Sequence, residues 1–308
     1  MSTADALLPG AVETRFGTIE QTMVRLLAGD RLPSPPLRAL ASTATATVVA
    51  VGPRERLVDA AAALRPHAQT GSIRAILIAV GSHPTPDVRV TASEILLDGL
   101  RTDFVNNAVA ALRLPSLPAL LWWRGGDPDR AVSLAKLADR LVLDAADPAP
   151  LWARLDALAR EAPVSDLRWT ALTRWRALMA HFFDLPGVPE AAASFDRLHV
   201  TGSDAHSARL FAGWLAAALK RTPADTRFVS GAQGPIEAAF FAGGGNELKL
   251  QRRGAACVEG HARVGGRETS RISSLGDQAL SALIAEELRV RPRDLAFESS
   301  VRAAGAFS

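Results

Sequence analysis

The sequence of 308 residues contains a single cysteine, Cys257, which excludes an internal disulfide and a thiolate metal cluster. Long apolar runs are also missing, since none approaches the roughly 20 residues needed to span a bilayer. The amino-terminal stretch lacks the basic start and apolar segment of a secretory signal. We therefore expect a cytoplasmic protein that does not enter a membrane.

Lysine is scarce, because Lys136, Lys220 and Lys249 are the only lysines in the chain. The remaining basic residues are arginines and histidines, and the net charge is only +3. Nucleic-acid binding would require clustered basic runs. The nearest approach to one is Arg252-Arg253, which opens an alternating stretch typical of a solvated strand. We therefore expect no nucleic-acid partner.

Motifs for the common chemistries are absent as well. The turn after the first expected strand reads VAVGPRER, with one glycine where a dinucleotide-binding turn has G-x-G-x-x-G. The glycine triplet Gly243–Gly245 lacks the lysine and following helix of a phosphate loop, and is predicted to be a hairpin turn. The histidines show no metal-ligand spacing, and no serine stands in a G-x-S-x-G elbow. The sequence thus predicts no catalytic residue, cofactor or metal, and favours a binding protein over an enzyme.

One loop leaves two interpretations open. Gly202–Ser207 joins an expected strand to an expected helix, so its backbone N–H groups are suited to hold an anion. Alternatively, Ser203 or Asp204 caps the helix. We favour capping, because the Asp204 carboxylate would repel a phosphate.

The first half of the chain alternates strands with helices, which is the pattern of a doubly wound sheet. A short helix at Ile19–Ala28 and a proline-rich linker at Arg31–Leu37 precede it. The expected elements are strand Thr45–Val51, helix Arg54–Leu64, strand Ile73–Val80, strand Val88–Leu97, helix Thr102–Leu112, strand Leu117–Trp123, helix Pro128–Ala138, strand Leu141–Asp144 and helix Pro148–Arg160. We predict an α/β fold whose N-terminal part is a doubly wound mixed sheet with helices on both faces.

A boundary is expected at Glu161–Asp166, which Pro163 punctuates. The elements expected beyond it are helix Asp166–Asp184, strand Leu198–Thr201, helix Ala205–Lys220, strands near Thr226–Ser230, Pro235–Phe241, Glu247–Arg253, Ala256–Val264 and Glu268–Ile272, and helix Gly276–Arg289. Closely spaced strands joined by glycine turns favour an antiparallel meander. We predict an N-terminal helix and linker over 1–42, an α/β domain over 43–162, and an α+β domain with a largely antiparallel sheet over 163–308.

The stretch Leu114–Arg130 ends a proline-bounded apolar strand with two tryptophans, an arginine and a Gly-Gly turn. Ligands and partners bind beyond the carboxyl ends of strands in open α/β sheets, so these groups have a reason to be exposed there. Adjacent side chains on a strand point to opposite faces, so Trp122 and Trp123 cannot share one core. The alternative is that each packs beneath a different helix layer.

The segment Asp166–Asp184 carries two more tryptophans and reads as a helix. If Asp166 caps it, Trp175 lies in the middle of an apolar stripe and belongs to the core. Trp169 falls off that stripe, near Thr173 and Arg176. If Thr173 is the cap instead, Trp169 lies in the preceding turn. Trp169 is therefore expected at the surface.

Partner surfaces are enriched in tryptophan and arginine, and this chain gathers both near strand and helix ends. The candidate partner-binding residues are Trp122, Trp123, Arg124, Trp169, Arg174 and Arg176.

Several segments, in their order and spacing, resemble the OpcA family of glucose-6-phosphate dehydrogenase assembly proteins. They are LPALLWW at Leu117–Trp123, LADRLVLDAAD at Leu137–Asp147, DLRWTALTRWRALMAHFFD at Asp166–Asp184, LHVTGSDAHSARLFAGWLAAAL at Leu198–Leu219 and LGDQALSALIAEELRV at Leu275–Val290. The resemblance covers most of the chain outside its amino-terminal segment.

The resemblance implies a protein that is not itself a catalyst. It would associate with the oligomeric glucose-6-phosphate dehydrogenase, which opens the oxidative pentose phosphate pathway, and promote its active form as an assembly factor or allosteric activator. The alternative, from a different class, is a sugar-phosphate or nucleotide-binding α/β enzyme that uses the loops after Val51, Val80, Trp123 and Thr201. That alternative requires an anion to bind there.

Overall fold

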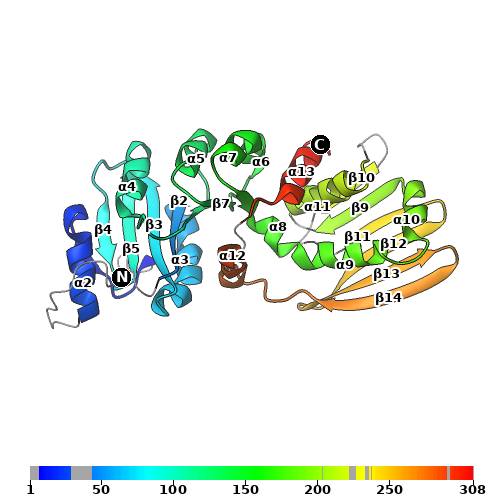
Figure 1. The fold of residues 1–308 in the computed structure, drawn as a ribbon, viewed down its shortest axis with the longest axis horizontal. Helices are drawn as coiled ribbons and strands as arrows, with labels where there is room; N and C mark the ends of the chain where they lie inside the picture. Colours follow the sequence, from blue (N-terminus) through cyan, green and yellow to red (C-terminus); the bar gives the residue numbers. More distant parts are fainter. Residues whose placement is uncertain are drawn as a thin grey trace. The chain divides into compact units, whose positions relative to one another are not determined.

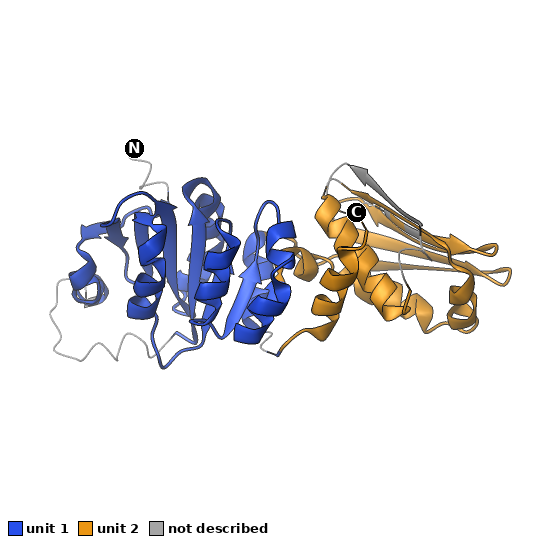
Figure 2. Cartoon of the chain, turned by 90° about the horizontal axis from the view of Figure 1, so that it is seen from above, with its two compact units in different colours: residues 1–165, 280–292 blue, residues 166–279, 293–308 orange. Residues whose placement is uncertain are grey.

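Two compact units make up the chain, which is described here by a computed structural model (Figure 2). Unit 1 holds Met1–Ser165 and Leu280–Pro292, and unit 2 holds Asp166–Ala279 and Arg293–Ser308. The structure describes residues 7–28, 44–202, 204–221, 227–232, 236, 238–289 and 292–307. The linker expected at Arg31–Leu37 lies outside these residues, whereas the helix expected at Ile19–Ala28 forms with those bounds as α2.

Unit 1 is built on an eight-stranded mixed sheet in the order β1-β4-β5-β3-β2-β6-β7-β8 (Figure 1). The strands β5, β3, β2, β6 and β7 are parallel, whereas β4 is antiparallel to both β5 and β1. Their bounds are β1 Val12–Thr14, β2 Ala46–Pro53, β3 Ile73–Gly81, β4 Asp87–Val90, β5 Glu94–Arg101, β6 Ala119–Trp123, β7 Arg140–Leu143 and β8 Val164–Asp166. This is the mixed sheet that the sequence predicts.

The strand order reverses at β2. The chain runs outward from β2 through β3 to β5, and then returns to β6 on the other side of β2 and continues to β7. Right-handed crossovers place α3 (Arg54–Gln69) on one face of the sheet, and α4 (Val105–Leu112) and α5 (Pro128–Ala135) on the other. The sheet is therefore covered on both faces, as predicted. The connections that follow β2 and β6 leave toward opposite faces of the sheet, which makes the carboxyl ends of these two strands a topological switch point.

Burial on both faces explains why the central strands read as unbroken apolar runs. Every residue from Ala46 to Gly52 in β2 and from Ile73 to Ala79 in β3 is buried. All five residues of β6 are buried too. Helices on both sides leave such strands no solvated face, so the polar alternation of an antiparallel strand is absent.

The sequence misses two breaks in unit 1. The single strand expected at Val88–Leu97 is a hairpin of β4 and β5, because Thr91 Oγ1 accepts hydrogen bonds from the N–H groups of Ser93 (3.4 Å) and Glu94 (3.1 Å). No glycine or proline marks this turn; a threonine hydroxyl stabilises it instead. The helix expected at Pro148–Arg160 is two short helices. The shorter helices of unit 1 are η1 Phe16–Thr18, η3 Thr102–Phe104, α6 Ala149–Trp152 and α7 Leu155–Glu161.

Helix α12 (Leu280–Arg289) belongs to unit 1, although the sequence places it in the C-terminal domain. It packs against α3, beside which it lies in Figure 1. The carbonyl oxygen of Ser281 is 3.1 Å from His67 Nε2 on α3. The segment Leu280–Pro292 thus completes the first unit from a position late in the sequence.

A buried ion pair fixes the inner side of α12. Glu287 Oε2 accepts a hydrogen bond from Arg140 Nε at 2.7 Å, and Glu287 Oε1 accepts one from the Ser165 hydroxyl at 2.8 Å. Arg140 and Glu287 are only 6% and 4% exposed. Arg140 also donates to the carbonyl oxygen of Pro292 at 3.3 Å. The end strands β7 and β8 therefore hold the later part of the inserted segment, from Glu287 to Pro292.

Unit 2 contains a six-stranded sheet in the order β10-β9-β11-β12-β13-β14. β9 and β10 are parallel and every other neighbouring pair is antiparallel, so the sheet is largely antiparallel as predicted. The strands are β9 Arg197–Gly202, β10 Arg227–Ala232, β11 Ala238–Gly243, β12 Asn246–Arg253, β13 Cys257–Val264 and β14 Arg267–Ser274. Gly244 and Gly245 form the predicted hairpin turn, with φ of +57° and +80° that favour glycine.

Helices cover one face of this sheet. The helices of unit 2 are α8 Leu167–Ala171, α9 Thr173–Phe183, α10 Val188–Ala191, η4 Ala192–Ser194, α11 Ala205–Ala218 and α13 Leu295–Ala304. α9 contacts β12, β13 and β14, and α11 contacts β9 and β10. α11 and α13 pack closely because Gly213 has no side chain; a Cβ there would overlap the carbonyl oxygen of Ser300.

Asp204 caps α11, which settles the loop that the sequence left open in favour of capping. Its Oδ1 accepts from the His206 N–H at 3.1 Å, and its Oδ2 accepts from the Ser207 hydroxyl at 2.6 Å and from Arg168 Nε at 2.9 Å. Burial alone would raise the pKa of Asp204. The hydrogen bond from Ser207 and the charge of Arg168 outweigh that effect, so its pKa is lowered.

We predict that Glu287→Ala lowers the free energy of unfolding by about 3–5 kcal/mol, because it leaves Arg140 charged and buried without its partner. Urea denaturation measures the change. Glu161→Ala, at an exposed residue of α7, is the control and should stay within about 0.5 kcal/mol of the parent. Equal effects of the two substitutions would contradict the anchoring role of the pair.

A second prediction concerns pH. The lowered native pKa of Asp204 contributes stability above the ordinary aspartate pKa of about 3.9, and this contribution is lost as pH falls through the native value. Asp204→Asn should therefore cost about 1 kcal/mol at pH 7, and the difference from the parent should shrink in acid. Urea denaturation of the parent and the variant, at pH 7 and in acid, measures this difference. A difference in the free energy of unfolding that does not change with pH would refute the prediction.

Candidate functional site

The carboxyl ends of β2 and β6 meet at the switch point, which is where doubly wound proteins bind ligands. β2 ends at Pro53, directly before α3, and β6 ends at Trp123, directly before Arg124. The strand ends are close together, since a Cβ on Gly52 would lie 2.9 Å from Arg124 Cβ. Glycine is therefore needed at position 52 for Arg124 to occupy this edge.

Arg124 is 2% exposed and its guanidinium is paired with two carboxylates. Nη2 lies 3.1 Å from Asp59 Oδ2 and 2.9 Å from Asp144 Oδ2, and Nη1 also pairs with Asp59. Its Cζ lies 4.7 Å from the centroid of the Trp122 ring, a cation–π contact. Asp59 belongs to α3 and Asp144 follows β7, so one arginine joins three neighbouring elements.

The start of α3 carries two more arginines, each paired. Arg54 Nη1 lies 2.5 Å from Asp98 Oδ2 on β5, and Arg56 Nη2 donates to the carbonyl oxygen of Asp144 at 2.8 Å. Burial raises the pKa of Asp98, and the charge of Arg54 offsets part of that rise. An anion at this edge would have to displace carboxylates that already neutralise the cations. The loops after Val51 and Trp123 therefore give the anion-binding alternative no support.

Trp122 and Trp123 are buried, with 0% and 1% of their surface exposed. They point to opposite faces of β6, and Trp123 lies beneath the turn, since a Cβ on Gly126 would stand 3.1 Å from its ring. With Arg124, they were expected to contribute to a contact surface, and that expectation of exposure is wrong. The helices on both faces bury these side chains, which leaves them no surface to offer a partner.

The expectation that Trp169 lies at the surface is also wrong, because it is 2% exposed. Asp166 does cap the helix, but the helix breaks at Leu172 into α8 and α9. Trp169 Nε1 donates to Asp294 Oδ2 at 2.7 Å, and its ring lies 5.9 Å from that of Phe297. Both partners belong to the C-terminal segment. This segment packs against the side of the helix that lies off the apolar stripe, where the sequence predicts exposure.

Two of the six candidate residues keep some exposure. Arg176 is half-buried, with its Cζ 3.4 Å from the centroid of the Trp169 ring, and its Nη2 donates to Thr173 Oγ1 at 3.3 Å. Arg174, on α9, is exposed. The structure thus joins Trp169 to Arg176 in one cluster of unit 2, whereas Trp122 and Arg124 belong to unit 1. Contact with a partner through Arg174 or Arg176 stays a prediction.

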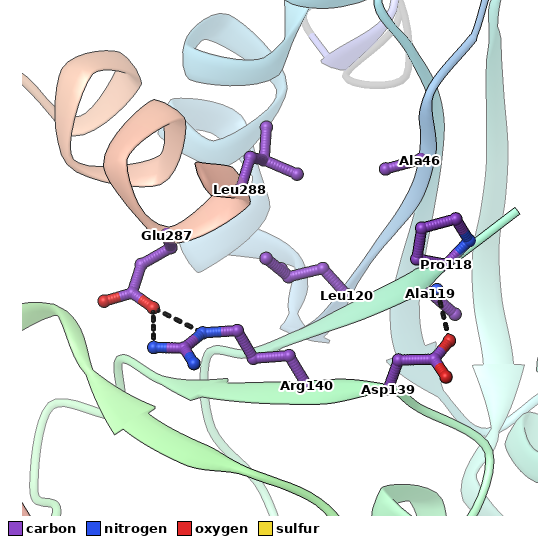
Figure 3. Close-up of a pocket in the computed structure, with 8 residues that line it drawn as sticks. All are labelled: Ala46, Pro118, Ala119, Leu120, Asp139, Arg140, Glu287 and Leu288. Atoms are coloured by element: carbon purple, nitrogen blue, oxygen red, sulfur yellow. Dashed lines mark hydrogen bonds and ion pairs between the residues drawn. The ribbon is translucent and has the colours of Figure 1, made fainter. Parts of the chain in front are cut away.

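A cavity of about 200 Å³ lies at the amino ends of β2, β6 and β7 (Figure 3). Its walls are Ala46, Pro118, Ala119, Leu120, Asp139, Arg140, Glu287 and Leu288. In Figure 3, Arg140 and Glu287 point toward each other and Asp139 turns to the backbone N–H of Ala119, 2.8 Å away. Arg140 and Glu287 thus anchor α12, and Asp139 joins the start of β7 to the start of β6 through the Ala119 N–H.

The described ranges contain neither a metal cluster nor a membrane helix. Within them, no group of three or more histidine, cysteine or acidic side chains is placed to hold a metal ion. In the same part of the chain, no helix is both long and apolar enough to cross a membrane.

Residues 162–301 match a family model whose description is the C-terminal domain of a glucose-6-phosphate dehydrogenase subunit. Two curated relatives are each described as "Putative OxPP cycle protein OpcA". The one from Nostoc punctiforme is 26% identical over 57% of this chain and 40% of the relative. The one from Synechocystis is 22% identical over 57% of this chain and 39% of the relative. The match thus spans about two-fifths of the length of these relatives.

Solved structures give weaker matches. The 3-ketoreductase KijD10 from Actinomadura kijaniata, in complex with NADP, is 12% identical, covers 84% of this chain and 94% of its own, and has a TM-score of 0.47. The dehydrogenase MviM from Clostridium difficile is 9% identical, with 84% and 96% coverage and a TM-score of 0.43.

Burial of Trp169 leads to a third prediction. Trp169→Ala should lower the free energy of unfolding by about 3–5 kcal/mol, because it removes a buried ring and leaves Asp294 without its indole donor. Arg174→Ala, at an exposed neighbour, should change it by no more than about 0.5 kcal/mol. Chemical denaturation measures the free energy of unfolding of both variants. A Trp169→Ala variant as stable as the parent would contradict the burial of this side chain.

Proposed function

Because this chain belongs to the OpcA family, we propose that it is a cytoplasmic, non-catalytic assembly factor and allosteric activator that binds glucose-6-phosphate dehydrogenase in the oxidative pentose phosphate pathway. The proposal rests on the family match of residues 162–301, whose description names that dehydrogenase. The description of both curated relatives as OxPP cycle proteins supports the pathway.

The closed switch point supports a binding role over a catalytic one. Arg124 stands where a doubly wound enzyme holds its ligand, and Asp59 and Asp144 neutralise it there. Opening this edge would take the buried guanidinium of Arg124 away from its carboxylate partners, which is costly. A rigid sheet edge of this kind suits a scaffold that presents its outer surfaces to another protein.

Activation by such a scaffold requires a difference in affinity. If the chain binds the active form of the dehydrogenase more tightly than the inactive form, it shifts the equilibrium toward the active form by that difference. Couplings of this kind are typically about 1–3 kcal/mol, or roughly 5–150-fold. Assembly follows the same rule when the active form is a higher oligomer, because the bound chain then favours association.

The outer side of α9 is the proposed contact. Arg174 is exposed there, and on the same helix His181 Nε2 lies 2.6 Å from Arg271 Nη1 of β14. The surface therefore presents basic groups side by side. Such a surface fits an acidic patch on the dehydrogenase, since complementary charges speed encounter and fix orientation.

We predict that Arg174→Glu weakens binding of the dehydrogenase at least about tenfold, because it places a carboxylate opposite an acidic surface. Isothermal titration of the same organism's dehydrogenase into the full chain measures the dissociation constant. Arg160→Glu, an equal charge reversal at an exposed residue of α7 in unit 1, is the matched control and should bind as the parent does.

Circular dichroism should show both variants folded, since neither side chain is buried. Equal affinities of the two variants would show that α9 is not part of the interface, without contradicting the binding of the dehydrogenase. No binding by the parent chain at micromolar concentration would reject the proposed function itself.

A further inference from the structure

β14 is the last strand of the unit 2 sheet among the described residues, so one side of it pairs with β13 and the other side is an open edge (Figure 1). It is eight residues long and contains no proline, and every residue except Ser273 is exposed. Many folded proteins shorten, bend or cover such edges, because the unpaired N–H and C=O groups readily take on another strand. A long, regular edge is suited to accept an extended segment of a partner.

The outward backbone groups of β14 belong to its even-numbered residues. The N–H of Leu275, directly after β14, donates at 2.7 Å to the carbonyl oxygen of Ala256, directly before β13. In an antiparallel ladder, successive residues of a strand turn their N–H and C=O groups alternately toward one neighbour and toward the other. Glu268, Ser270 and Ile272 therefore turn theirs away from β13. Together they offer a row of donors and acceptors along the open edge.

The arginine side chains of β14 lie on the face of the sheet that α9 covers. Arg271 is paired in register with Gly260 of β13, and Gly260 faces α9, since a Cβ there would overlap the Phe182 ring. Directly opposite residues of antiparallel strands share a face, so Arg271 lies on the α9 side. The distance of 2.6 Å between Arg271 Nη1 and His181 Nε2 on α9 agrees with this. Arg267, four residues earlier, shares the same face.

The α9 side of this edge is basic. Arg174 lies near the end of β14, because its Nε would be 4.0 Å from a Cβ on Gly276. α9 contains no acidic residue, and the single acid of β14, Glu268, points to the other face. On that other face, Ile272 is 63% exposed. An added strand would thus meet arginines with one set of alternate side chains and Ile272 with the other set.

We propose that the edge of β14 binds an acidic segment in extended conformation, which adds to the sheet as a further strand. The backbone of this segment pairs with Glu268, Ser270 and Ile272. Carboxylates at alternate positions face Arg267 and Arg271, and an apolar side chain between them contacts Ile272. That the segment belongs to the dehydrogenase rests on the proposed function.

A second copy of this chain fits the edge less well. Antiparallel pairing of β14 with itself about a twofold axis keeps the same face of both sheets on one side, so the arginines of both copies gather there. Like charges on directly neighbouring strands are destabilising. Carboxylates meet the same arginines favourably, which selects an acidic occupant.

Isothermal titration of the full chain with synthetic peptides tests the proposal. The probe is a capped peptide of alternating glutamate and valine, as long as β14, and its counterpart carries lysine in place of glutamate. We expect saturable binding of the glutamate peptide and no binding of the lysine peptide at the same concentrations. Ser270→Pro should weaken binding of the glutamate peptide about tenfold or more, because it removes an outward N–H. Proline is tolerated on an edge strand where the N–H faces solvent, so we expect this variant to fold.

Arg271→Glu is the second variant and should also weaken binding of the glutamate peptide about tenfold or more, because it places a carboxylate opposite the acidic side chains. Arg197→Glu is the matched control. It makes the same charge reversal at an exposed residue of β9, which three strands separate from β14, and should bind as the parent does.

Three results would overturn the proposal: no saturable binding of the glutamate peptide by the parent, equal binding of the lysine peptide, or unchanged affinity in either folded variant, Ser270→Pro or Arg271→Glu. Self-association of the parent in sedimentation, abolished by Ser270→Pro, would assign the edge to a second copy instead. None of these measurements contains the dehydrogenase, so their failure is distinct from a failure of the dehydrogenase to bind the chain.

Discussion

The buried pair of Arg140 and Glu287 joins a helix from late in the sequence to the sheet of unit 1. The polypeptide leaves unit 1 after Ser165, builds most of unit 2, and returns to unit 1 with Leu280–Pro292 before it ends in unit 2. The returning helix buries Leu283 and Ile284 and contacts α3, and its buried carboxylate meets an arginine and a serine on the last strands of the first sheet. Unit 1 is therefore incomplete until the chain reaches Pro292.

A second ionic cluster occupies the switch point of the unit 1 sheet. The strand order of the sheet creates a switch point of the kind that holds nucleotides in other doubly wound proteins. Here Gly52 lets Arg124 approach the end of β2, and Asp59 and Asp144 hold its charge. The edge that binds ligands in other doubly wound proteins thus holds strands and helices of this unit together. Under the proposed function, the outer surfaces of the protein act on its partner while this edge remains closed.

Local patterns in the sequence predict most of the architecture. Unbroken apolar runs such as Ala46–Gly52 reveal the covered parallel strands, and the glycine turn between β11 and β12 reveals a hairpin of the second sheet. Breaks without glycine or proline escape detection, as at Thr91. The candidate site is predicted poorly, since Trp169 is buried by Asp294 and Phe297, more than 120 positions away in the chain. Pairings between distant charges likewise leave no trace in one sequence.

The most direct test of the central claim is the initial rate of the same organism's glucose-6-phosphate dehydrogenase across substrate concentrations, with and without an equimolar amount of this chain. The proposed function predicts a lower half-saturation constant or a higher maximal rate, by roughly 5-fold or more when the coupling lies in the usual range. Identical rate curves in the two conditions, with the enzyme and the chain eluting separately, would contradict it.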